Sequence, residues 1–315
     1  MLHMDTPNLE ILQTFGLDTL PNLDVVVLGA LELFDKTGIP TLDLGDYKIP
    51  LVLGSGNAAV TGRILFDDKN AIFADESTYK RKLENIKGID GAILLSASGS
   101  KHAIALSQDL LSHGIETRLL TNNQEAPAKK YINDDNFFVF PKNREPYTYN
   151  TSTYMGMILG KTKENPKNIK KFITDEVDPI IPKNLADYDA FYVLIPERFD
   201  AFREMLATKF DELFQPKVSG RVFTPEQSKH AKSVVKYDKE LFISFGYDNT
   251  QFGLPKNRLN IPLPVDVDYG TLMAVSYYVM GNMQKQHEPY FKNGIEDYVK
   301  KAGEAFGITL GVIVE

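Results

Sequence analysis

The chain contains no cysteine among its 315 residues. A disulfide framework, a thiol nucleophile and a thiolate metal site are therefore excluded. No apolar run reaches the roughly 20 residues that a membrane-spanning helix needs. The first residues also lack the basic flank and the apolar core of a secretory signal. These absences predict a cytoplasmic protein with no membrane partner.

The numbers of acidic and basic residues in the sequence are similar. The 35 lysines and arginines are set against 42 aspartates and glutamates, which gives a formal net charge of -7 at pH 7. This balance argues against a nucleic-acid partner, because such proteins concentrate positive charge. Histidine pairs at metal-ligand spacing and acidic calcium loops are also missing, so we expect no metal. Missing hydrolase and phosphate-loop kinase motifs disfavour those activities.

The hydrophobic content of 43% is enough for a large core. Residues 51–140 alternate short apolar runs with helix-length amphipathic runs. The predicted strands are residues 51–53, 71–74, 92–95, 117–120 and 137–140, and the predicted helices are residues 58–65, 79–86, 102–112 and 127–132. Strands that alternate with helices predict an α/β fold with a mostly parallel sheet covered on both faces.

A polar, lysine-rich segment with a proline occupies residues 161–168. Such a segment is typical of a domain boundary, so we expect one domain over residues 1–165 and a second over 166–315. The alternating pattern then resumes, with predicted strands at 191–195 and 241–245 and predicted helices at 198–214, 269–283 and 295–305. The sequence therefore predicts two α/β halves.

A serine-rich loop lies between the predicted strand at 92–95 and the predicted helix at 102–112. It contains Ser96, Ser98, Gly99, Ser100 and Lys101. Free N–H groups at a helix start, the positive end of the helix dipole and several hydroxyls together form an anion site. We therefore expect this loop to bind a phosphate group. The alternative is a solvated loop whose serines cap the helix.

A glycine-rich turn follows the first predicted strand and consists of Gly54, Ser55, Gly56 and Asn57. The turn fits the loose dinucleotide pattern Gly-x-Gly-x-x-Ala, and Asp75 ends the next strand, where a ribose-binding acid would lie. An NAD(P)-dependent dehydrogenase is therefore one alternative, and a tight turn without a cofactor is another.

A third stretch places Glu145, Thr148 and Thr151 before a helix. These residues either cap that helix or form a second wall of the same pocket.

Residues 45–160 resemble the sugar isomerase (SIS) domain. The resemblance lies in four elements that occur in the family's order: the turn at 54–59, Asp75, the Ser-x-Ser-Gly loop at 96–99, and Glu145 with its threonine-rich helix start. The second half resembles another SIS domain, as in phosphoglucose/phosphomannose isomerases and the isomerase half of glucosamine-6-phosphate synthase. The resemblance implies two SIS-like domains, each a mostly parallel sheet flanked by helices in three layers. It also implies a phosphosugar ligand, aldose–ketose isomerisation of a hexose or amino-hexose 6-phosphate, no cofactor and a homodimer.

The resemblance further implies two catalytic residues. Glu212, late in a predicted helix, corresponds to the base that moves a proton between C1 and C2. His230 ends a stretch that resembles the family's Glu-x-x-His element, with one extra residue, and corresponds to the ring-opening group from a neighbouring subunit. A carboxylate near a helix C-terminus and a histidine suit these tasks. Ala58, Lys101 and Ala103 depart from the family pattern, so a non-catalytic sugar-phosphate-binding protein is an alternative.

Overall fold

The computed structural model describes residues 7–231 and 233–315. Its helices are α1 Asn8–Thr14, α2 Leu23–Thr37, α3 Asn57–Leu65, α4 Tyr79–Asn85, α5 His102–Ser112, α6 Thr151–Thr162, α7 Pro166–Phe172, α8 Arg203–Phe214, α9 Pro225–Ala231, α10 Tyr269–Gln286 and α11 Tyr290–Phe306. Its strands are β1 Pro50–Leu53, β2 Ile72–Ala74, β3 Gly91–Leu95, β4 Thr117–Thr121, β5 Phe137–Val139, β6 Glu145–Pro146, β7 Ala190–Leu194, β8 Ser219–Phe223, β9 Glu240–Phe245, β10 Arg258–Ile261 and β11 Ile313–Val314. The predicted α/β class is confirmed.

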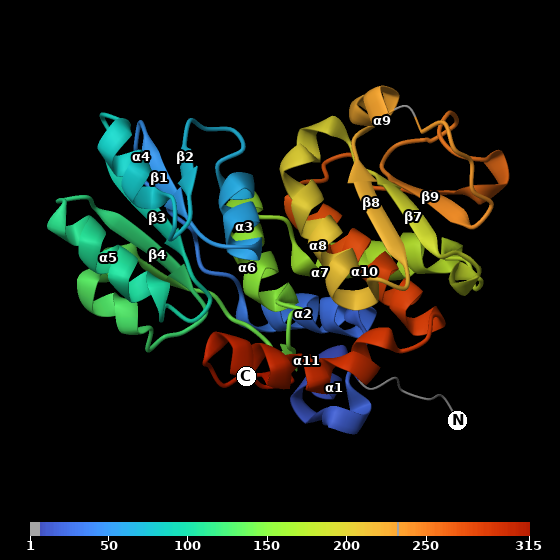
Figure 1. Ribbon diagram of the computed structural model, residues 1–315, viewed down its shortest axis with the longest axis horizontal. Helices are drawn as coiled ribbons and strands as arrows, with labels where there is room; N and C mark the ends of the chain where they lie inside the picture. Colours follow the sequence, from blue (N-terminus) through green and yellow to red (C-terminus); the bar gives the residue numbers. More distant parts are fainter. Residues whose placement is uncertain (1–6, 232) are drawn as a thin grey trace. The chain divides into compact units, whose positions relative to one another are not determined.

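The first sheet has the strand order β2-β1-β3-β4-β5, and all of its pairs are parallel. Alternate residues of a strand point to opposite faces. Leu51, Leu53 and Leu94 pack on one face in a core cluster with α4 and α5 residues. On the other face, α3 comes close because Gly62 lies against Val52. Figure 1 shows α4 and α5 on one side of these strands and α3 and α6 on the other, which makes three layers.

The second sheet has the order β10-β9-β7-β8 and is also parallel. Phe191 on β7 stacks on Phe210 of α8, whose ring also fills the space beside Gly220. The opposite face carries Tyr192 and Phe242, whose rings stack with their centroids 4.7 Å apart. Both predicted halves therefore contain a parallel sheet, as expected for two SIS-like domains.

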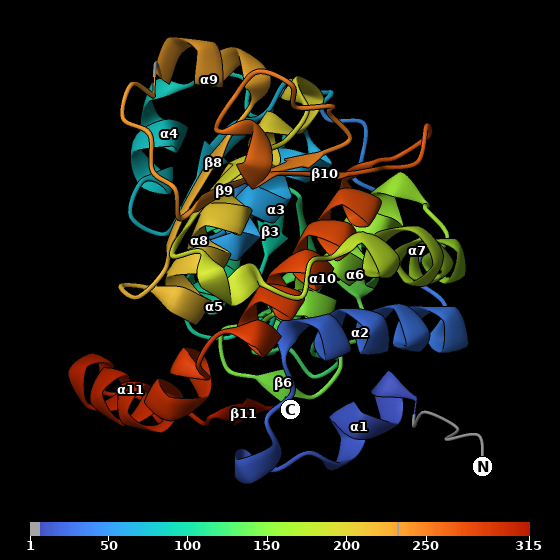
Figure 2. The same cartoon turned by 90° about the vertical axis from the view of Figure 1, so that its right-hand side faces the viewer.

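The chain divides into two compact units that differ from the contiguous domains predicted at 1–165 and 166–315. The first-sheet unit contains residues 37–142 and 153–163, and the second-sheet unit contains residues 7–36, 143–152 and 164–315 among those described. Residues 7–36 join the second-sheet unit because α2 packs on α10. A Cβ added at Gly281 of α10 would lie 1.9 Å from the backbone nitrogen of Asp24 on α2, and Figure 2 shows the two helices together. One SIS-like domain on each side of residue 165 stays a proposal.

Three predicted elements differ from those in the structure. The predicted helix 127–132 is a short 3₁₀ segment, Pro127–Tyr131. The predicted helix 198–214 is interrupted, because Phe199 has non-helical dihedral angles within a 3₁₀ segment, Glu197–Phe202, that precedes α8. Amphipathic periodicity continues across such a break and does not reveal it. The polar segment 161–168 is largely helical, since α6 ends at Thr162 and α7 begins at Pro166 with a cap from Asn165.

Candidate functional site

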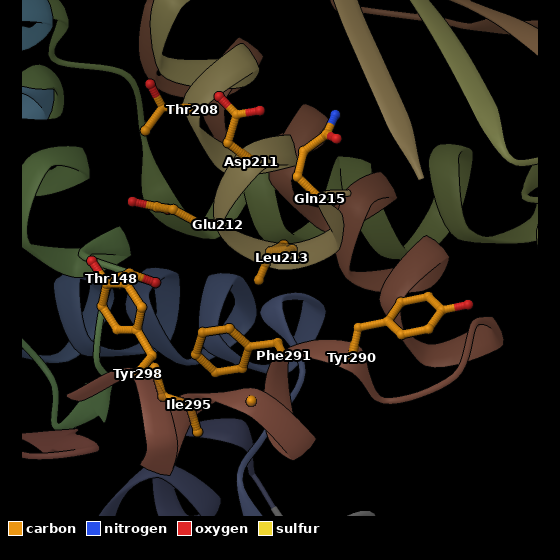
Figure 3. A pocket seen from close by; sticks show the side chains of 11 residues that line it. Thr148, Thr208, Asp211, Glu212, Leu213, Gln215, Tyr290, Phe291, Ile295 and Tyr298 are labelled. Atoms are coloured by element: carbon orange, nitrogen blue, oxygen red, sulfur yellow. The ribbon is translucent and has the colours of Figure 1, made fainter. Parts of the chain in front are cut away.

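A cavity of about 490 Å³ in the second-sheet unit contains Glu212 in its wall. Its lining residues are Thr148, Thr208, Asp211, Glu212, Leu213, Gln215, Tyr290, Phe291, Gly294, Ile295 and Tyr298. Figure 3 shows polar side chains from α8 along one side and the rings of α11 along the other. The cavity thus has a polar wall with carboxylates and an apolar, aromatic wall, which suits a ligand with both kinds of surface. We call it the Glu212 cavity.

Glu212 is one turn from a lysine that is completely enclosed. The side chain of Lys209 is 0% exposed, and its Nζ donates to Glu212 Oε2 at 2.5 Å. The same ammonium donates to the backbone carbonyls of Thr148 and Tyr149, each at 2.9 Å. An ammonium has three donors, so these three acceptors satisfy it. Lys209 therefore fixes both the carboxylate and the chain segment across from it.

Burial raises the pKa of the Glu212 carboxyl above its ordinary value, although Lys209 acts in the opposite direction. Loss of hydration penalises the charged form, and the adjacent ammonium favours it. A raised pKa makes a carboxylate a stronger base, and therefore better suited to accept a proton. Glu212 therefore has the properties expected of a general base.

Thr148 lies on the other side of Lys209 in a strained turn. The turn spans residues 146–149 and is closed by the Tyr149 N–H, which donates to the Pro146 carbonyl at 3.2 Å. Thr148 is its third residue and has a φ of 76°. A β-branched residue in this region is a true outlier, and glycine or asparagine is the usual occupant. Holding threonine there costs about 1–3 kcal/mol.

Glu145 acts on the start of α6. Its carboxylate accepts the backbone N–H groups of Thr151 and Ser152, each at 2.7 Å, and also the Ser152 hydroxyl. Burial raises the pKa of this carboxyl, and these bonds oppose that effect. Glu145 and Thr151 thus serve as a helix cap. A direct contact of either residue with a ligand stays a prediction.

The serine loop lines a separate, smaller cavity of about 190 Å³ in the first-sheet unit. Ser96, Ser98, Ser100 and Lys101 all contribute to its wall, together with Gly54 and Ser55 of the glycine-rich turn. The structure thus brings together residues that are about 45 positions apart in the sequence, because both loops follow neighbouring parallel strands, β1 and β3. Ligands in such sheets bind at the carboxyl ends of strands.

Gly99 and Gly56 shape these loops. Gly99 has a φ of 59°, and a Cβ there would lie 2.4 Å from the Cβ of Ala126. Gly56 has a φ of 54° and precedes α3, which begins at Asn57. Lys101 also has a positive φ, 51°, at the start of α5. The side chains of Ser98 and Ser100 contact each other with their oxygens 2.7 Å apart.

One oxygen of the Asp75 carboxylate is held by the turn that follows it. That oxygen accepts the N–H and hydroxyl groups of both Ser77 and Thr78. These bonds lower the pKa of Asp75. The neighbouring Glu76 accepts the Ser55 hydroxyl. Asp75 therefore organises the turn that leads into α4.

His230 lies apart from the Glu212 cavity. It is on α9, its side chain is 80% exposed, and its Nε2 is 3.7 Å from a carboxylate oxygen of Glu226. It is not among the described residues that line the cavity. The single chain therefore does not bring the two predicted catalytic residues together, and a role for His230 stays a proposal that requires a second chain.

Lys209 was missed by sequence reasoning, although a signal was present. It lies among Leu206, Phe210 and Leu213 on the apolar face of α8, and a lysine there requires a buried partner. Glu212, three positions later, is the partner that helical geometry offers.

Within residues 7–231 and 233–315, no cluster of three or more histidine, aspartate or glutamate side chains could hold a metal, and no helix is long and apolar enough to cross a membrane.

The sequence matches no protein-family model. It also matches no curated protein. Solved structures do resemble it. Glucosamine-6-phosphate deaminase from Thermotoga maritima is 15% identical, with a TM-score of 0.59 over 85% of this chain and 94% of its own. The C-terminal domain of glucosamine-fructose-6-phosphate aminotransferase from Francisella tularensis is 11% identical, with a TM-score of 0.58 over 86% and 97%.

Tagatose-6-phosphate ketose/aldose isomerase from Escherichia coli is 16% identical, with a TM-score of 0.52 over 81% of this chain and 85% of its own. At these identities the comparisons show the fold. The chain therefore has the fold of these proteins, and the resemblance to two SIS domains predicted from the sequence is confirmed at that level.

Proposed function

We propose that this protein is a sugar-phosphate isomerase that interconverts an aldose and a ketose phosphate by proton transfer. The observation that carries the proposal is Glu212, a carboxylate with a raised pKa in the wall of a cavity and paired with a fully buried lysine. The ligands and reactions in the names of the structurally similar proteins support a phosphosugar as substrate. The chemistry needs no cofactor.

Glu212 takes the proton from one of the two carbons and returns it to the other. The first transfer leaves an enediolate and the second consumes it, while a second proton passes between the C1 and C2 oxygens through solvent. A single carboxylate therefore serves both transfers at carbon. Lys209 is a positioning residue in this scheme, because its three donors are already used. It holds the carboxylate in place and favours the ionised form that a base requires.

The phosphate group binds at the serine loop in this proposal. Ser96, Ser98 and Ser100 offer hydroxyl donors, Lys101 offers a point charge, and α5 begins at His102 with the positive end of its dipole. Gly54, Ser55, Gly56 and Asn57 supply the adjoining turn at the start of α3. The carboxylate of Glu76 lines the same cavity but is held by Ser55.

A proton-exchange experiment tests the reaction. The protein is incubated in deuterium oxide with fructose 6-phosphate, glucosamine 6-phosphate or arabinose 5-phosphate, and NMR follows deuterium at C1 and C2. Glu212→Gln is expected to abolish exchange. Asp211→Asn changes a neighbouring carboxyl in the same cavity and should retain most of it. Exchange that survives Glu212→Gln would refute the assignment of the base.

The homodimer and His230 are tested together by mixing two inactive variants. If a site combines Glu212 of one chain with His230 of another, a mixture of Glu212→Gln and His230→Ala forms some intact sites. Random pairing in equal amounts restores about one quarter of the wild-type sites. A mixture that stays inactive, although size measurements show dimers that exchange subunits, would refute the shared site.

A non-catalytic phosphosugar-binding protein is the second candidate. The exposed His230 and the absence of a hydroxyl at Ala58 favour it. This candidate predicts that fructose 6-phosphate or another tested phosphosugar raises the melting temperature while no deuterium enters at C2. Stabilisation by NAD(P) in place of phosphosugars would contradict both candidates.

A further inference from the structure

One oxygen of the Glu212 carboxylate is free to act on a ligand in the cavity. Oε2 is bound to Lys209, whereas Oε1 accepts no hydrogen bond from another of the described residues. The side chain is 19% exposed and lines the cavity, so a ligand there can reach it. Figure 3 shows the carboxylate extending to the side of the cavity where the ring of Tyr298 lies.

Tyr298 offers an accessible hydroxyl on that side. It comes from α11, lines the Glu212 cavity and is 52% exposed. Its hydroxyl has no hydrogen-bond partner among residues 7–231 and 233–315. Figure 3 shows the ring extending from α11 with its hydroxyl end toward Glu212, whereas the hydroxyl of Tyr290 points away. A free donor therefore stands across from the free carboxylate oxygen.

The ring of Tyr298 packs beside a neighbour that is itself anchored. Its centroid lies 6.3 Å from that of the Tyr147 ring. Tyr147 donates its N–H to the Val312 carbonyl at 2.7 Å, next to the antiparallel pair of β6 and β11. Burial raises the pKa of the Tyr147 hydroxyl, and Tyr298 and Glu212 both add to the rise. Groups act on a pKa in this way only when they are near, so the three side chains form one cluster.

The proposed reaction creates a negative charge in this cavity. When Glu212 takes the proton from C2 of an aldose, the electron pair of that C–H bond forms the C1–C2 double bond, and the carbonyl pair moves onto the C1 oxygen. No lysine or arginine occurs among the described lining residues, and the three donors of Lys209 are already used. The Thr148 hydroxyl is enclosed. The charge therefore requires a neutral donor that a ligand can reach.

We propose that Tyr298 is a catalytic residue whose hydroxyl donates a hydrogen bond to the C1 oxygen of the substrate as the enediolate forms. The inference rests on the proposed function and deepens it, because it names the group that stabilises the intermediate. The phenol keeps its proton throughout. A donor aimed at a developing oxyanion lowers the barrier, because its bond to that oxygen is stronger than its bond to the carbonyl.

The inference concerns the α-hydroxycarbonyl end of the substrate alone. This end contains the two reacting carbons and their oxygens, and it lies between Glu212 on α8 and Tyr298 on α11. Both residues belong to the second-sheet unit, as do the other described residues that line the cavity. A two-carbon compound without a phosphate is therefore a sufficient probe of the contact.

Two matched substitutions isolate the hydroxyl. Tyr298→Phe removes it and keeps a half-exposed ring, so folding should not change. Tyr147→Phe makes the same change in the neighbouring ring, which is not among the described residues that line the cavity. NMR measures the rate of deuterium incorporation with the sugar phosphates named above. Calorimetry measures the binding of glycolohydroxamate, whose two adjacent oxygens copy those of an enediolate. The melting temperature confirms that each variant is folded.

Tyr298→Phe is expected to slow deuterium exchange about 100-fold, as loss of one oxyanion donor does. It should also weaken glycolohydroxamate binding about tenfold, because a hydrogen bond to a charged oxygen is lost. Tyr147→Phe should change neither quantity. The inference is overturned if Tyr298→Phe exchanges as fast as wild type, if it binds the hydroxamate as tightly, if wild type binds no hydroxamate, or if Tyr147→Phe loses as much as Tyr298→Phe.

The pattern of exchange distinguishes this failure from failure of the proposed function. Exchange that Glu212→Gln abolishes and Tyr298→Phe retains refutes the inference alone. Exchange that persists in Glu212→Gln but is lost in Tyr298→Phe refutes the assigned base and supports the inference. Absence of exchange in wild type refutes the isomerase and the inference together.

Discussion

Replacing Lys209 by methionine tests the central feature of the Glu212 cavity. The substitution keeps the length and apolar character of the side chain but removes the buried ammonium. It leaves the Glu212 carboxylate without its counter-charge and two carbonyls, those of Thr148 and Tyr149, without their donor. Removing one partner of a buried ion pair costs about 3–5 kcal/mol. Because the Glu212 side chain is 19% exposed, we expect the lower end of this range.

The chain offers a matched control in Lys229, which pairs with Glu226 at the same spacing of three residues. Both side chains of that pair are more than half exposed, at 56% and 58%. An exposed pair contributes about 0–1 kcal/mol, so Lys229→Met should hardly change the free energy of unfolding. Urea denaturation of wild type and both variants measures the difference.

The cost of Lys209→Met should also depend on pH. Without the ammonium, the pKa of Glu212 rises beyond its already raised value, so the carboxyl becomes neutral more readily. A neutral carboxyl no longer requires a counter-charge, and the cost is therefore smaller at pH 5 than at pH 8. A cost equal to that of Lys229→Met, or one that does not vary with pH, would refute this account of the site.

Three further substitutions test other parts of the structure. Burial raises the pKa of the Asp24 carboxyl above its ordinary value of 3.8. The protonated carboxyl therefore stabilises the fold fully below pH 3.8, and this contribution is lost as the pH rises through the folded-state pKa. The melting temperature of Asp24→Asn should rise relative to that of wild type as the pH increases. Gly99→Ala, which meets Ala126, should destabilise more than Gly114→Ala, where φ is also positive but the space is open, and it alone should weaken inorganic-phosphate binding in calorimetry. Glu145→Gln should lower the free energy of unfolding by about 1–3 kcal/mol and speed amide exchange at the start of α6, because one acceptor becomes a donor; unchanged exchange would contradict the capping role.

The sequence predicted all five strands of the first sheet but only the two central strands of the second. Strands β1, β3, β7 and β9 are short apolar runs because both of their faces are covered, and each coincides with a predicted strand. Strands β8 and β10 were not predicted. They are the two edges of the second sheet, and their sequences include Ser219, Arg221 and Asn260, which an edge position tolerates.

The division of the chain and the geometry of the site depend on contacts that no local pattern encodes. Helix α2 was not predicted, since its run of Val25, Val26 and Val27 lacks a clear helical period. Its partner α10 is more than 230 residues later in the sequence. The strain at Thr148 is equally invisible in the sequence, because glycine or asparagine is expected where φ is positive. Glu212 was found only through a family resemblance, whereas its partner Lys209 could have been inferred from helical spacing.

Helices α6 and α10 begin in the same way, and this similarity bears on where a phosphate can bind. Glu145 accepts N–H groups at the start of α6, and Glu164 accepts the N–H groups of Asp268, Gly270 and Thr271 at the start of α10. A buried or partly buried carboxylate already occupies the position that an anion would take at each helix start. A phosphate would have to displace a covalently tethered anion there. Helix α5 instead begins beside serine hydroxyls and Lys101, so the competition among helix starts favours the serine loop as the phosphate site.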